Sequence, residues 1–258
     1  MVSTEKCKNF LLGLIVPFLV LIIWKATTYF EMAPRQLLVP PEEVFQSLRD
    51  LVADGSLIEN VRISLMRILL GLSWGVVAGV LLGTAMGSSR IIDRFVGPLF
   101  HGFRQVPMFG WMPFLILLFG IDEEFKVIFI GLSAFYPMVL NTYEGIRNVS
   151  CEYLEVAKVF EYSQARLFLR VVIPAAMPSI FIGLRTSVSM SWMSVVGAEL
   201  IASSSGIGFL MSNSRSMFKY EIVFAGVVVI GIIGFLMSLF IGKLERYILR
   251  WRKTFITG

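Results

Sequence analysis

Long apolar stretches recur along this chain, and a membrane-spanning helix takes roughly 20 mostly apolar residues. The stretches that reach or approach this length are 9–30, 64–86, 96–120, 127–143, 179–200 and 222–241. The composition agrees, because 56% of the residues are hydrophobic and 16% are charged, whereas soluble chains average about 25% charged residues. The sequence therefore predicts an all-α, polytopic membrane protein with about six transmembrane helices.

The third stretch, 96–120, is interrupted by Pro107 and Pro113. Proline removes a backbone donor and clashes with the preceding turn. Inside a bilayer such a break survives only where protein or a water-filled cavity satisfies the freed backbone groups. We therefore predict a short helix that ends near Pro107 and a second helix through 114–118. Arg104 lies near the inner end of this stretch, where an arginine can meet an anion or a lipid phosphate.

The orientation follows from the basic residues after the last span. That segment carries one acid, Glu245, and the bases Lys243, Arg246, Arg250, Arg252 and Lys253. Short segments rich in Lys and Arg stay in the cytoplasm. The C-terminus, and with an even number of spans also the N-terminus, is predicted to be cytoplasmic.

An amphipathic helix is predicted after the first span. It begins at Pro41, has Val44, Leu48 and Leu51 on one face, and stops before Gly55. We expect it to lie on the outer membrane surface.

The chain divides into two parts on this basis. Residues 1–63 hold the first span and the outer amphipathic helix. Residues 64–258 form the core, which includes a long polar connection at 144–178.

Glycines recur at every fourth position of the second span. They are Gly71, Gly75, Gly79, Gly83 and Gly87. Residues four apart lie on one helix face, so this strip without side chains lets another helix approach closely. We expect tight packing within the bundle; the alternative is a surface along which helices slide.

The polar connection 144–178 has the pattern of two short helices. Tyr153, Val156, Ala157 and Phe160 fall at the i, i+3, i+4 and i+7 positions of an amphipathic helix. We expect a second helix that Ser163 caps, that runs through 167–172 and that Pro174 and Pro178 end. The residues alone leave two roles open for this pair of helices, a contact with another protein or a position on the lipid headgroups.

Charged residues near the spans need an explanation, since one charge at a helix centre costs about 2.5–3.5 kcal/mol on insertion scales. Arg67, Lys126 and Glu199 fall near the predicted outer ends. There we expect their side chains to snorkel to the headgroups. Gate contacts and ion pairs within the bundle are the alternatives.

The fifth span combines bulky and hydroxyl side chains. Met190, Trp192, Met193 and Ser194 are candidates for lining a transport pathway of mixed polarity. Packing is the alternative, because apolar side chains at this spacing more often face other helices.

The polar connection also carries the spacing of a known motif. Glu155-Val156-Ala157 is followed after three residues by position 161 and, after nine more, by Val-Val-Ile-Pro at 171–174. This pattern resembles the EAA loop of ABC importer permeases. The segments 119–123, 141–148, 173–179 and 205–208 resemble the branch for sulfonates, taurine and nitrate, which also includes bicarbonate and vitamin-precursor importers. The likeness covers nearly the whole chain and implies the type I ABC importer permease fold.

One residue departs from the motif, because Glu161 stands where the family has glycine. A residue with a Cβ is penalised if the turn between the two helices needs positive φ. We therefore expect either a turn shifted by one residue or a longer first helix.

The resemblance implies a function and partners. The connection would be the coupling helix that contacts an ATP-binding subunit through Glu155, Val156, Ala157, Phe160, Glu161 and Pro174. The chain has no G-x-x-x-x-G-K-[ST] phosphate loop, so ATP and Mg would be bound by that partner. The resemblance also implies an extracytoplasmic solute-binding protein, a second copy of the chain, and a place among the lipids of a bacterial or archaeal cytoplasmic membrane. The solute would be a small anion such as a sulfonate, taurine, nitrate or bicarbonate, with no nucleic acid involved.

Two other classes of function are weighed against this one. A secondary transporter driven by an ion gradient predicts paired acids or His in mid-membrane and internal repeats, and the sequence shows neither. An intramembrane enzyme needs a catalytic constellation, and the chain has one His and two cysteines, Cys7 and Cys151, without metal or redox spacing. We therefore expect no catalytic residue and no metal site.

Overall fold

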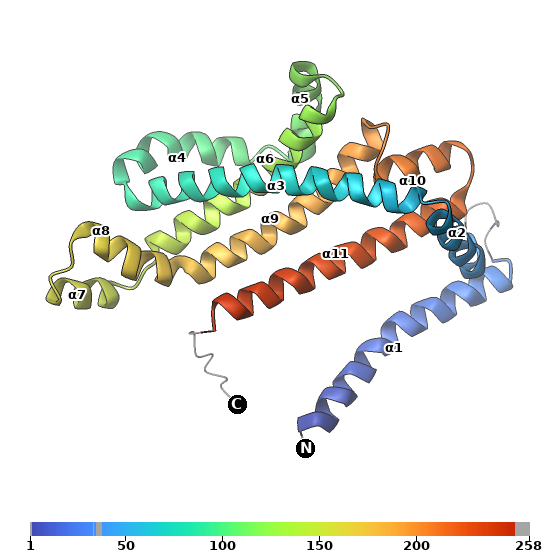
Figure 1. Cartoon of the computed structure of the whole chain (residues 1–258), viewed down its shortest axis with the longest axis horizontal. Helices are drawn as coiled ribbons and strands as arrows, with labels where there is room; N and C mark the ends of the chain where they lie inside the picture. Colours follow the sequence, from blue (N-terminus) through green and yellow to red (C-terminus); the bar gives the residue numbers. More distant parts are fainter. Residues whose placement is uncertain (1, 33, 35–37, 251–258) are drawn as a thin grey trace.

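The computed structural model describes residues 2–32, 34 and 38–250, with side chains from residue 15 onward. All secondary structure in this part of the chain is helical (Figure 1). The helices are α1 (Val2–Tyr29), α2 (Pro41–Ala53), α3 (Ser56–Ser88), α4 (Arg90–Arg104), η1 (Met108–Trp111), α5 (Met112–Phe119), α6 (Glu123–Arg147), α7 (Cys151–Val159), α8 (Gln164–Leu167), η2 (Phe168–Val172), α9 (Ile173–Ile201), α10 (Ile207–Ser216) and α11 (Tyr220–Ile248).

Four helices of the described chain are long and apolar enough to cross a membrane. They are α3, α6, the continuous helix Gln164–Ile201 and α11. A fifth is reached if Arg90–Arg104 and Met108–Phe119 count as one broken span. In α1, the apolar segment with described side chains, Ile15–Tyr29, is shorter than a span. The all-helical membrane architecture is thus confirmed, whereas the count of six is not reproduced as such.

The predicted break in the third stretch is confirmed. α4 ends at Arg104, and the chain turns by 94° before the helical segment Met108–Phe119. Pro107 lies at the turn with φ −54°. Because Pro107 has no N–H to continue the helix, the segment after it leaves in a new direction.

The centre of the bundle is α6, which packs between α3 and α9. Phe125, Phe129 and Ile130 of α6 are fully buried. At the far end from α7 and α8, helices α2, α10 and α11 close the bundle (Figure 1) around an apolar cluster that also includes Ile130 of α6. One end of the bundle therefore carries the loop helices α7 and α8, and the other end is closed by α2, α10 and the start of α11.

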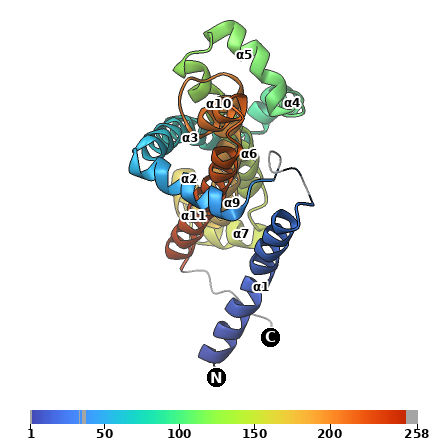
Figure 2. The same cartoon turned by 90° about the vertical axis from the view of Figure 1, so that its right-hand side faces the viewer.

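The predicted helix after the first span is present as α2. Its Val44 and Leu51 are 3% and 7% exposed and belong to the apolar cluster shared with α3, α9 and α11. The apolar face thus packs on the bundle. α1 lies at the edge of the molecule (Figure 2), where Trp24 Nε1 donates to the Val39 carbonyl oxygen at 3.0 Å and the Trp24 and Phe224 rings are 5.7 Å apart.

The expectation that Pro174 and Pro178 end the second loop helix is wrong. Ser163 does cap α8, accepting a hydrogen bond from the Arg166 N–H. The helix then widens into a π-helix, η2, and continues through both prolines as α9. A proline in a regular helix clashes with the carbonyl four residues earlier, and a wider turn before Pro174 relieves that contact.

Candidate functional site

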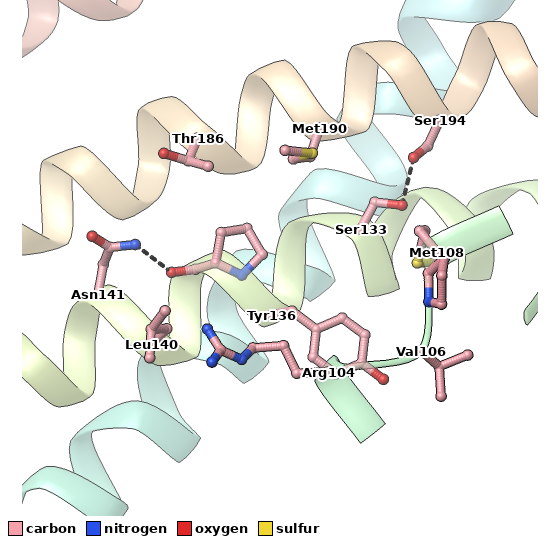
Figure 3. A pocket seen from close by; sticks show the side chains of 12 residues that line it. Arg104, Val106, Met108, Ser133, Tyr136, Leu140, Asn141, Thr186, Met190 and Ser194 are labelled. Atoms are coloured by element: carbon pink, nitrogen blue, oxygen red, sulfur yellow. Dashed lines mark hydrogen bonds between the residues drawn. The ribbon is translucent and has the colours of Figure 1, made fainter. Parts of the chain in front are cut away.

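A pocket of about 350 Å³ lies midway along α6 and α9 (Figure 3). The end of α4 and the turn that follows it form its other wall. Its lining residues are Arg104, Val106, Pro107, Met108, Ser133, Tyr136, Pro137, Leu140, Asn141, Thr186, Met190 and Ser194. Pockets of a few hundred Å³ with a few placed polar groups are typical of small-molecule sites.

The serine and threonine hydroxyls and the asparagine amide of the pocket are held by the backbone or by each other. Ser133 and Ser194 share a hydrogen bond of 2.6 Å between α6 and α9. The Asn141 amide donates to the Pro137 carbonyl at 2.8 Å, and the Thr186 hydroxyl donates to the Ile182 carbonyl at 3.0 Å. Figure 3 shows the first two of these bonds on the walls of the pocket.

The predicted pathway residues fall on two different faces of α9. Met190 and Ser194 line the pocket against α6. Trp192 and Met193 line a separate pocket of about 270 Å³ between α9 and α11. An α-helix has 3.6 residues per turn, so Met190 and Ser194, four positions apart, share a face, whereas Trp192 points to the opposite face and Met193 lies between the two.

Other serines of α9 serve the contact with α6. Ser187 donates to the Ala134 carbonyl at 2.7 Å and Ser191 to the Ile130 carbonyl at 3.5 Å. Both serines are fully buried. Polar side chains that bond across helices are a common means of association inside a bilayer.

The first loop helix, α7, lies at one end of the bundle (Figure 1). Of the predicted amphipathic face, only Ala157 is buried, at 4% exposure. Tyr153, Val156 and Phe160 are 58%, 56% and 69% exposed. Glu155 is also exposed, and Pro174 is half-buried at the start of α9. The helix thus keeps an apolar surface turned away from the bundle.

The turn after α7 is built on Glu161 itself, which has φ +53°. The Tyr162 N–H donates to the Ala157 carbonyl at 3.1 Å, and the Glu161 N–H donates to the Lys158 carbonyl at 2.9 Å. These two bonds are the Schellman motif that ends many helices and that favours glycine at the left-handed position. Both expected alternatives, a shifted turn and a longer first helix, are therefore wrong.

The glycine strip of α3 faces α6. A Cβ at Gly75 would lie 2.3 Å from the Gly131 carbonyl oxygen, and one at Gly83 would lie 2.6 Å from the Val139 carbonyl oxygen. At Gly71, Gly79 and Gly87 the nearest atoms would be side-chain carbons of α6, at 2.7, 2.7 and 3.0 Å. At Gly75 and Gly83 the nearest obstacle is backbone, so a methyl group would push the helices apart, whereas at Gly71, Gly79 and Gly87 the nearest side-chain carbons of α6 would have to shift.

The charged residues near the outer ends do not snorkel, and this expectation is wrong. The Arg67 and Lys126 residues are each 3% exposed and Glu199 is 1% exposed. Arg67 donates to Glu199 at 2.7 Å and, with two nitrogens, to Glu123 at 2.6 and 2.7 Å. The side chains are long enough to find partners within the bundle, which removes the cost of an isolated buried charge.

The same cluster fixes the segment between α9 and α10. Glu199 also accepts from Ser64 at 2.8 Å and from the Gly208 N–H at 3.0 Å. Arg67 donates to the Ser205 carbonyl at 2.8 Å. The cluster therefore joins α3, α6 and α9 to the turn before α10.

Metal ligands are not gathered anywhere in the described part of the chain. No group of three or more His, Cys, Asp or Glu side chains among these residues is placed to hold a metal ion. The pocket between α6 and α9 and the exposed loop helix are therefore the two candidate sites.

A helical membrane bundle with a pocket midway along its central helices and a folded connection at one end defines a membrane transport subunit. The chain belongs to the family of binding-protein-dependent transport system inner membrane components, whose model matches residues 75–250. It is thus the permease subunit of an ABC importer and not an enzyme.

Individual relatives agree with this assignment. The chain is 33% identical to the putative aliphatic sulfonates transport permease protein SsuC of Bacillus subtilis (strain 168), over 94% of this chain and 88% of the relative. It is 30% identical to the taurine transport system permease protein TauC of Escherichia coli (strain K12), over 90% of this chain and 86% of that relative.

Solved structures support the fold. The structure of an inward-facing MetNI methionine ABC transporter matches with a TM-score of 0.65 at 14% identity, covering 76% of this chain and 97% of that one. The type I ABC importer permease fold expected from the loop is confirmed.

The sequence did not identify Tyr136, Asn141 and Thr186 as pocket residues. Each lies within an apolar stretch, and although Asn141 begins the family-like segment 141–148, nothing in the sequence places it in a pocket. One indication was present, the arginine at 104 beside a predicted helix break.

Proposed function

We propose that the chain transports a small anion across the cytoplasmic membrane, and that an ATP-binding subunit drives this transport by binding the loop helix α7. The observation that carries the coupling role is the exposed apolar surface of α7, formed by Tyr153, Val156, Val159 and Phe160. Val159 is 81% exposed. An exposed apolar patch marks a contact with a protein or with a membrane, and membership of the binding-protein-dependent transport family supports the protein contact.

The structure refines which residues would make this contact. Ala157 is buried, so we infer that it supports the helix and is not the contact itself. Val156 and Phe160 would enter the partner, with Glu155 and Glu161 at the rim and Pro174 at the base. ATP and Mg would be held by the partner, and the loop would pass its movement to α9 through the continuous helix that begins at Gln164.

The test replaces exposed apolar residues and leaves the fold of the loop intact. Val156→Asp combined with Phe160→Asp should abolish ATP-dependent uptake and recovery of the ATP-binding subunit on the purified permease. Amounts of permease in the membrane should not change. Glu152→Gln, an exposed substitution on the same helix, is the control. Unchanged uptake by the double variant would contradict the coupling role.

The proposed solute class is a small anion. The relatives that support it are permeases whose names refer to aliphatic sulfonates and taurine. An extracytoplasmic solute-binding protein would deliver the solute, as the family name implies. Uptake of radiolabelled taurine, ethanesulfonate, nitrate and bicarbonate by the complete transporter in proteoliposomes would identify the anion.

We infer that the α7 end of the bundle faces the cytoplasm, together with both termini. Basic side chains gather at this end, among them Arg90, Arg94, Arg147, Arg166 and Lys243, whereas Asp122, Glu123, Glu124 and Glu59 lie at the other. Such a bias matches the rule that cytoplasmic segments are basic. The predicted tail residues Arg252 and Lys253 lie outside the described residues. Labelling of Cys151 from the cytoplasmic side only would support this orientation.

The assembly proposed is a pair of permease chains on a pair of ATP-binding subunits, surrounded by lipid. The sequence placed the start of the core at residue 64. Because α2 buries Val44 and Leu51 in the bundle, we propose instead that only α1 is peripheral and that the core begins at α2. Crosslinking of the purified complex, followed by measurement of its mass, would test the stoichiometry.

A further inference from the structure

We propose that the pocket between α4, α6 and α9 is a binding site for the head group of an anion in transit, with Arg104 as its cationic contact. This proposal rests on the proposed function as an anion permease. It adds where in the bundle the anion binds and which residues contact it. The site would take a small organic anion that carries one negative charge.

The position of the pocket is that expected of a transport site. Ser133 to Asn141 occupy the middle of α6 (Glu123–Arg147), and Thr186 to Ser194 occupy the middle of α9 (Ile173–Ile201). Both helices are long and apolar enough to span a membrane. The pocket is therefore at the depth where a passing solute is furthest from water on either side, and where transporters place their binding sites.

The charge of the pocket is uncompensated. Arg104 is its one ionisable basic group, and none of its lining residues is Asp or Glu. Among the residues with described side chains, Arg104 makes no ion pair and no side-chain hydrogen bond. Arg104 is exposed on the isolated chain, so its guanidinium is open to a ligand that enters the pocket. In contrast, Arg67 has carboxylate partners on two helices.

Neutral donors line the same pocket as the guanidinium. Figure 3 shows the Arg104 guanidinium between Leu140 and Tyr136, with the Tyr136 hydroxyl at the far end of its ring. The Asn141 amide uses one of its two N–H groups on the Pro137 carbonyl, which leaves the second free for a ligand. A guanidinium fork, with an amide and a phenol in the same pocket, suits the oxygens of a sulfonate or a similar oxoanion.

The rest of the wall accepts a short hydrocarbon part. Met108, Leu140 and Met190 add apolar surface among the polar groups. Methionine side chains are flexible and adapt to differently shaped apolar ligands. A volume of about 350 Å³ admits a small anion and excludes a bulky one.

The first experiment measures the electric field of the site without requiring the transported solute. Met190→Cys is made in the full chain with Cys7 and Cys151 replaced by serine, and the protein is placed in nanodiscs of phosphatidylcholine. Its thiol is labelled with anionic 2-sulfonatoethyl methanethiosulfonate and with a neutral methanethiosulfonate. We expect Arg104→Gln to lower the ratio of anionic to neutral labelling rates by about tenfold, since a charge in a cleft raises local ion concentration by this order.

The same labelling measurement includes a control variant and a competing anionic lipid. Arg94→Gln removes an exposed arginine from the same helix and should leave the ratio unchanged. Nanodiscs that contain phosphatidylglycerol distinguish a solute site from a lipid-phosphate site. Loss of the anionic preference in these discs would assign Arg104 to lipid and overturn the proposal, as would an equal ratio in Arg104→Gln and the parent.

The second experiment measures transport by the complete transporter in proteoliposomes. Arg104→Gln should lower ATP-dependent uptake of radiolabelled ethanesulfonate at least tenfold, and Arg104→Lys should restore part of it. If the parent imports no anion but the labelling preference depends on Arg104, the proposed function fails and the site stands. If the parent imports the anion and Arg104→Gln imports it equally well, the site is overturned and the function stands.

Discussion

Arg67 of α3 donates a hydrogen bond to Glu199 of α9 at 2.7 Å, and their side chains are 3% and 0% exposed. The two residues lie 132 positions apart in the sequence. Their pairing holds the ends of two membrane helices together where neither charge has access to water. Several consequences of this and of the other contacts can be measured.

Arg67→Gln should destabilise the permease strongly, because it leaves the Glu199 carboxylate buried without a cation. Removing one partner of a buried pair costs about 3–5 kcal/mol. Thermal unfolding of the purified protein in detergent would measure the loss. Glu124→Gln, at an exposed acid on α6, is the matched control and should change little.

The double variant Arg67→Met with Glu199→Met gives a second comparison. Removing both charges avoids the unpaired carboxylate, so this variant should be more stable than Arg67→Gln. If Arg67→Gln unfolds at the same temperature as the parent, the pair does not hold the helices together.

Gly75→Ala should force α3 away from α6. The new methyl carbon would lie 2.3 Å from the Gly131 carbonyl oxygen, which is backbone and cannot rotate away. Overpacking of this kind costs about 1–3 kcal/mol, measurable by thermal unfolding. Gly231→Ala in α11 meets no atom within 4 Å and should be neutral or slightly stabilising. Equal melting temperatures for the two variants would exclude close packing at Gly75.

Glu161→Gly should stabilise the turn after α7. A residue with a Cβ is penalised by about 1–2 kcal/mol in the left-handed region, and Glu161 has φ +53°. Hydrogen exchange at the Glu161 and Tyr162 amides, which form the two bonds of the turn, should slow several-fold. Glu161→Ala keeps the Cβ and should not slow it. Similar exchange in the two variants would show that the backbone is not strained there.

Val44→Ala should destabilise the bundle while Phe45→Ala should not. Val44 is 3% exposed in the apolar cluster, and its neighbour Phe45 is 71% exposed. Truncating a buried aliphatic side chain costs about 1–3 kcal/mol. Unfolding in detergent would compare the two. A larger loss at Phe45 would show that α2 buries its other face.

Local features were within reach of the sequence because they depend on neighbouring residues. The helix that begins at Pro41, the cap at Ser163 and the break at Pro107 each follow from the chemistry of one turn. The Gly75 strip also had a recognisable period. In contrast, Pro174 does not end its helix. A π-helical turn precedes it, and no pattern in the sequence predicts that turn.

The sequence by itself determined that the chain is a helical membrane protein, where its apolar helices lie, and which family its loop resembles. These properties depend on composition, period and local spacing. Only the tertiary structure decided that Arg67 pairs with Glu199, that Met190 and Trp192 face different pockets, and that Arg104 stands unpaired in one of them. The reason is physical: the partner of a buried charge and the face a helix presents depend on which helices pack together, and that choice is made by residues far apart in the chain.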